Sequence, residues 1–127
     1  MTIADYQYID ATLVDRLVRE LAGDVRAGAR FIRDFVAGWE VRVARLLDAA
    51  ERQDPEDVTT VLLSVRTSSA MLGAQSLSLA AADLQDDLVA SRRVDKVAVV
   101  RFIELGTSAC SELADLARRL ESGGVRA

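Results

Sequence analysis

The stretch DPEDVTTVLLSVRTSSAMLGA, residues 54–74, contains the clearest helix start in the chain. Asp54 is a good N-cap, Pro55 suits the first helical position, and the two acids that follow favour the positive end of the helix dipole. Apolar and small side chains then recur at helical spacing and are expected to face a core: Val58, Val61, Leu62, Val65, Ser68, Ser69 and Leu72. Gly73 either kinks this helix or ends it.

Similar periodicity extends in both directions from this stretch. A short helix is predicted over residues 10–21, a long one over 25–52, a further segment after Gly73, and a last helix over 95–120. Their expected core positions are Leu13, Leu17 and Leu21; Phe31, Phe35, Trp39, Val43, Leu46 and Ala50; Leu77, Ala81, Leu84 and Leu88; and Val99, Phe102, Ile103, Cys110, Leu113, Ala117 and Leu120.

The composition agrees with packed helices. Half of the 127 residues are apolar, only 5% are aromatic, and there is a single proline. Strand-rich proteins contain more aromatic and β-branched residues than this chain does. Long apolar faces joined by short links predict an all-α fold, an antiparallel four-helix bundle with a short additional N-terminal helix. No linker or repeat divides the chain, so residues 1–127 are expected to form one domain with its core over about 9–120.

Several classes of function are disfavoured by what the sequence lacks. The chain has no histidine, which removes imidazole bases and ordinary zinc sites, and it has no Gly-rich phosphate loop. We therefore expect no enzyme activity, no cofactor and no metal. A net charge of −4 argues against nucleic acid, and no apolar run is long enough to span a membrane. The single cysteine, Cys110, is expected to be buried and suits a cytoplasmic protein.

The segment from Leu63 to Ala74 resembles the signature of the histidine-containing phosphotransfer (HPt) domain family. That signature has histidine, Ser or Thr, Leu, Lys, Gly or Ser, two small residues, and then a stretch that ends in Leu-Gly-Ala. The matching positions are Ser64, Val65, Arg66 in place of lysine, Ser68, Ser69, Leu72, Gly73 and Ala74. Ile9-Asp10, the 20–24 turn, the Phe31/Phe35 helix and Leu77 through Leu84 also resemble family elements, so the resemblance covers about residues 9–120.

Two departures from the family pattern decide what the resemblance implies. Leu63 occupies the position of the phospho-accepting histidine, and its side chain has no nucleophile. Thr67 stands where the family usually has Gly or a very small residue. The resemblance therefore implies a degenerate member of the family that cannot carry a phosphoryl group but has kept the surroundings of the site.

Helical geometry independently places five residues on one face. With Val61 pointing inward, Leu63 lies about 200° around the helix, and its neighbours one turn away fall on the same side. We call this set the docking face: Thr59, Leu63, Arg66, Thr67 and Ala70. It carries a single charge, which is unusual for a solvent face and reasonable for a surface that binds a protein.

The expected function is a non-phosphorylatable HPt-like protein that binds the receiver domain of a bacterial response regulator, or a histidine kinase, and modulates a phosphorelay without transferring phosphate. A monomer or weak homodimer is expected. The alternative is a structural or oligomerisation bundle that has lost the signalling surface, with Leu63 buried against a second copy. A receiver phosphatase is less favoured, because the chain has no Asn, and Gln75 and Gln85 lack an evident acidic partner.

Overall fold

The computed structural model describes residues 6–123, of which 83% are helical, and these residues contain no strand. Five helices follow one another along the chain: α1 (Ala11–Glu20), α2 (Val25–Glu51), α3 (Pro55–Met71), α4 (Gln75–Ser91) and α5 (Lys96–Ser122). The predicted all-helical fold is confirmed, and the predicted bounds of the first, second and last helices lie within two residues of the observed ones.

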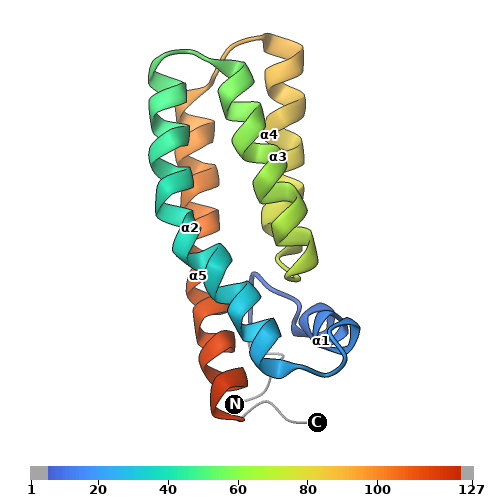
Figure 1. Cartoon of the computed structure of the whole chain (residues 1–127). Coiled ribbons are helices and arrows are strands. Elements are labelled where there is room, and N and C mark those ends of the chain that lie inside the picture. Colours follow the sequence, from blue (N-terminus) through green and yellow to red (C-terminus); the bar gives the residue numbers. More distant parts are fainter. Residues whose placement is uncertain (1–5, 124–127) are drawn as a thin grey trace.

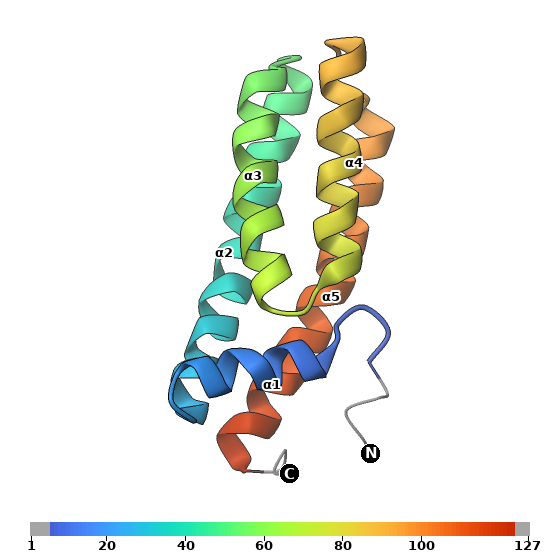
Figure 2. The same ribbon diagram turned by 90° about the vertical axis from the view of Figure 1, so that its right-hand side faces the viewer.

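The four longer helices run alongside one another, and α1 lies across one end of them (Figure 1). The long helices α2 and α5 form one antiparallel pair, and the shorter α3 and α4 form a second pair that packs against one half of the first. Figure 2 shows α1 crossing beneath the turn that joins α3 to α4. This arrangement leaves the outer side of α3 uncovered by any other helix.

Side-chain caps explain where the helices begin. Asp54 accepts a hydrogen bond from the backbone N–H of Asp57 at 3.1 Å, and Pro55 opens α3 as predicted. Asp10, Asp24 and Asp95 cap α1, α2 and α5 in the same way. Four of the five helix starts are therefore encoded locally by an aspartate, whereas α4 follows Ala74 without a side-chain cap.

Gly73 ends α3 rather than kinking it. Its φ of +76° is a left-handed conformation that glycine adopts without strain, and the chain turns back into α4 within three residues. Its carbonyl accepts a hydrogen bond from the Asp10 N–H at 2.7 Å, and a Cβ atom at Gly73 would overlap the Asp10 carbonyl oxygen. The turn after α3 is thus held against the segment that leads into α1.

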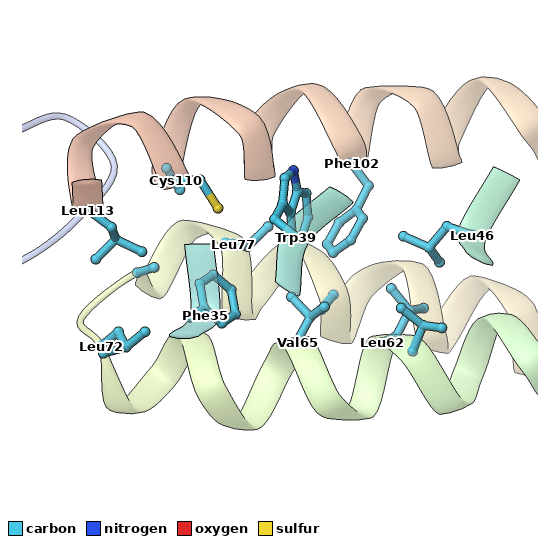
Figure 3. Packing of buried hydrophobic residues seen from close by; sticks show 14 of the residues in the cluster. Phe35, Trp39, Leu46, Leu62, Val65, Leu72, Leu77, Phe102, Cys110 and Leu113 are labelled. Atoms are coloured by element: carbon cyan, nitrogen blue, oxygen red, sulfur yellow. The ribbon is translucent and has the colours of Figure 1, made fainter. Parts of the chain in front are cut away.

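The core fills the space between the two helix pairs (Figure 3). Leu62, Val65, Leu72 and Leu77 are completely buried, and Cys110 is buried beside them as predicted. Trp39 packs between two other rings, with centroid distances of 6.3 Å to Phe35 and 6.2 Å to Phe102. The α3 positions predicted to face inward are buried, except that Ser68 is only half-buried.

The predicted core is wrong at Phe31, and the predicted core residues Leu13, Leu21 and Ile103 are only half-buried. Phe31 was expected to point inward with Phe35 and Trp39, but it is 36% exposed, whereas Ile32 is completely buried. A four-residue step turns 400° around a helix, so a stripe with this spacing rotates about 40° at each step. The stripe on α2 faces the centre of the core at Phe35 and Trp39 but has rotated away from it at its two ends, Phe31 and Val43. Val43 is accordingly only half-buried.

Candidate functional site

The docking face lies on the outer side of α3. Leu63 is 48% exposed, and Arg66, Thr67 and Ala70 are exposed as well, whereas Thr59 is half-buried. Val61 and Val65, which flank Leu63 at two residues on either side, are buried. The predicted exposure of Leu63 is therefore confirmed, and the structure brings all five predicted residues to one helix.

The hydroxyl groups around Leu63 are bonded to helix carbonyls. Thr67 Oγ1 donates to the Leu63 carbonyl oxygen at 3.0 Å, so this hydroxyl is turned toward its own helix. Ser78 of α4 donates to the Arg66 carbonyl oxygen at 3.1 Å and fixes the register of α4 beside the docking face. Buried Ser69 donates to the carbonyl of Val65. The outer side of α3 thus presents methyl and methylene groups more than free hydroxyls.

Arg42 of α2 is a site residue that the sequence analysis missed. Its guanidinium Nη2 donates to Ser64 Oγ at 3.1 Å, and its guanidinium carbon lies 5.3 Å from the centroid of the Phe35 ring. These two contacts hold a cation beside α3, on the flank away from Ser78. Phe31, Asp34, Phe35, Arg42 and Ser68 line a small hollow of about 190 Å³ between α2 and α3. The sequence does contain a signal for this placement of Arg42. Arg42 lies seven residues after Phe35, close to two full helical turns, and so lies on the same face of the helix.

The electrostatic character of this surface is distinct from that of the rest of the chain. Residues 58–74 contain no Asp or Glu, although the chain has 20 acidic residues. Neither Arg42 nor Arg66 forms an ion pair with any residue in the part of the chain that the structure describes. At the start of α3, by contrast, Asp57 is bonded to both Arg45 and Arg52. The outer side of α3 is therefore apolar and weakly positive on an acidic protein.

The described residues offer little reactive chemistry. Between residues 6 and 123 no three His, Cys, Asp or Glu side chains come close enough to hold a metal ion. Burial raises the pKa of the Cys110 thiol to about 12, so it is not a nucleophile at neutral pH. The side-chain oxygen of Gln85 is buried without a hydrogen-bond partner in this part of the chain, so it is not placed to orient a surface water.

Comparison with known proteins identifies no relative of this chain. No protein-family model, no curated protein and no solved structure matches the chain. Within residues 6–123, no helix is long and apolar enough to cross a membrane.

Proposed function

We propose that this protein is a non-phosphorylatable HPt-like signalling protein, a four-helix bundle with a short N-terminal helix, whose docking face binds a receiver domain or a histidine kinase. The observation that best supports this proposal is the setting of Leu63. An apolar side chain with about half of its surface exposed lies at the middle of α3, where the family resemblance places the phospho-accepting histidine.

The charges around Leu63 favour a partner with an acidic surface. Arg66 on the docking face and Arg42 on the adjoining flank both lack a carboxylate partner within the described chain. A receiver domain carries a cluster of carboxylates at its phosphorylation site, so complementary charge would steer the two surfaces together. Arg66 is suited to pair with those carboxylates or with an aspartyl phosphate.

The consequence of such binding is occupancy rather than chemistry. Leu63 cannot accept a phosphoryl group, because its side chain has neither a nitrogen nor an oxygen atom. A bound receiver would be withheld from its kinase or from its target, or its phosphoryl group would be shielded from water. Phosphate would remain where it was before binding.

The test is a titration of fluorescently labelled receiver domains and kinase domains with the purified full-length chain. We expect saturable binding by at least one of them, weaker binding by Arg66→Ala, and a shallower salt dependence for that variant, because it lacks one of the contacting cations. Absence of binding to all of them would contradict the proposal. So would a concentration-dependent homodimer that Leu63→Glu dissociates, because the docking face would then be a contact between copies.

A further inference from the structure

A second charged feature lies near the start of α2, next to the end of α5. Arg26, Arg30 and Arg33 line a hollow of about 320 Å³ together with Glu121 of α5. We call this set the arginine hollow. It brings three guanidinium groups against one carboxylate, on a chain whose net charge is −4.

The carboxylate in the arginine hollow is already engaged. Arg33 Nη2 lies 2.6 Å from Glu121 Oε1, and this hydrogen bond lowers the pKa of Glu121. Arg26 and Arg30 are exposed and form no ion pair with any described residue. Asp34, one turn after Arg30, lines the separate hollow beside Arg42 instead. Two of the three guanidinium groups in the hollow therefore have no ion-pair partner among residues 6–123.

This arrangement is unfavourable for the helix that carries it. Arg26 lies in the first turn of α2, at the positive end of the helix dipole, where the capping carboxylate of Asp24 is the only acidic group. Arg26 and Arg30 are four residues apart, and Arg30 and Arg33 are three apart, the two spacings at which like charges on a helix repel one another. Repeated like charges that oppose the stability of a helix are expected at functional sites.

We propose that the arginine hollow binds a phosphate-type oxyanion, such as pyrophosphate or a small phosphate monoester. Arginine forks pair with phosphate oxygens through two parallel N–H bonds, and two uncompensated guanidinium groups match a dianion in charge. The volume exceeds what one phosphate group needs and leaves room for a second phosphate or a small ester. None of the lining residues is aromatic, so the hollow offers no platform on which a nucleobase could stack.

The experiment is isothermal titration calorimetry of the full-length chain with pyrophosphate, in a phosphate-free buffer of low ionic strength. We expect saturable binding at one site. Arg30→Gln should weaken it about tenfold, the effect of losing a charge-assisted hydrogen-bond pair. Arg101→Gln is the matched control, because Arg101 is exposed on α5 and lines none of these hollows. It changes the net charge equally and should leave affinity unchanged.

Removing a carboxylate, which makes the protein one unit more positive, gives a sharper comparison of two positions on α5. Glu121→Gln frees Arg33 for the ligand and should tighten binding several-fold, whereas Glu104→Gln, elsewhere on α5, should not. A parallel sedimentation assay uses vesicles of phosphatidylcholine with and without phosphatidic acid, whose headgroup is a phosphate monoester. Vesicle binding that Arg30→Gln abolishes would assign the same site to a lipid headgroup.

Three results would overturn the proposal. The first is that neither pyrophosphate nor phosphatidic acid vesicles bind. The second is that Arg101→Gln weakens binding as much as Arg30→Gln does. The third is that Glu121→Gln and Glu104→Gln have equal effects, because binding would then report the net charge of the protein and not this hollow.

Discussion

The indole ring of Trp39 on α2 lies directly against the backbone of Gly106 on α5. A Cβ atom added at Gly106 would overlap the six-membered part of that ring, and the indole N–H donates to Thr107 Oγ1 at 3.1 Å. Trp39 also contacts Phe35 and Phe102, so it cannot move aside without disturbing both. The close approach of α2 and α5 therefore depends on the absence of a side chain at residue 106.

Gly106→Ala is expected to destabilise the protein by about 2 kcal/mol or more, because overpacking forces a large, fixed ring to shift. The measurement is urea unfolding followed by the fluorescence of Trp39, the only tryptophan in the chain. Gly38→Ala is the control, because its Cβ would meet only the guanidinium end of the Arg42 side chain, which can shift without moving a ring of the core. In a helix interior, alanine is more stabilising than glycine by up to about 1 kcal/mol. The Gly38→Ala variant should therefore be as stable as the wild type or more stable. Equal losses in the two variants would contradict this account of the α2–α5 contact.

Cys110 should be unreactive in the folded protein. Its pKa of about 12, raised from 9.0 by burial, leaves almost no thiolate at pH 8, so modification by a disulfide reagent should be slow and should accelerate in urea. The raised pKa also has a consequence for stability. The folded state holds the thiol proton more tightly than the unfolded state does. The protonated thiol therefore contributes fully to the free energy of unfolding below pH 9, and this contribution is lost as the pH rises toward 12. Cys110→Ala should flatten this alkaline loss, and rapid labelling of the native protein would contradict the burial.

The stability of the α2–α3 junction should respond to acid through Asp57. The hydrogen bond from Arg45, with a smaller contribution from Arg52, lowers the pKa of this carboxyl. The folded state therefore favours the ionised form, so the stabilisation is present above the pKa of an unfolded aspartate, about 4, and is lost as the pH falls through the lower folded value. Asp57→Asn should reduce the free energy of unfolding at pH 7 and weaken its dependence on pH below 4. The measurement is a series of urea melts across that range, and parallel curves for the two proteins would contradict the assignment.

No phosphoryl group should be transferred to the chain from a phosphorylated receiver or from an active histidine kinase. Phosphohistidine requires an imidazole, and the chain has none. Acid-labile radioactive label on the purified protein would show this prediction to be wrong. Leu63→His places an imidazole beside Arg66 and should permit slow labelling. Labelling should be faster when Thr67→Gly removes the side chain whose hydroxyl is bonded to the residue 63 carbonyl.

The helices could be predicted from the sequence because their signals are local. Asp54 and Pro55 fix the start of α3, and the spacing from Val58 to Leu72 fixes which side is buried, so the exposure of Leu63 followed directly. Phe31 could not be placed correctly, because periodicity alone does not show where a rotating stripe leaves the core. The contact of Arg42 with Ser64 and the pairing of Arg33 with Glu121 join residues 22 and 88 positions apart. Such contacts depend on how the helices pack, which the pattern within a single helix does not specify.

The measurement that tests the central claim most directly compares three leucine- or valine-to-glutamate variants by thermal melting and by capture of the receiver or kinase partner. Leu47 on α2 is the matched control, because it is 47% exposed, close to the 48% of Leu63. It lies two residues after Arg45, which pairs with α3, and therefore points away from the docking face.

Leu63→Glu should abolish capture and change the free energy of unfolding by no more than about 0.5 kcal/mol, the usual range for a surface substitution. Leu47→Glu should melt and bind like the wild type. Val65→Glu should unfold the protein, at a cost of about 3 kcal/mol or more, because it buries an unpaired charge. If Leu63→Glu melts like Val65→Glu, or captures the partner as well as Leu47→Glu does, the docking face is not the binding surface.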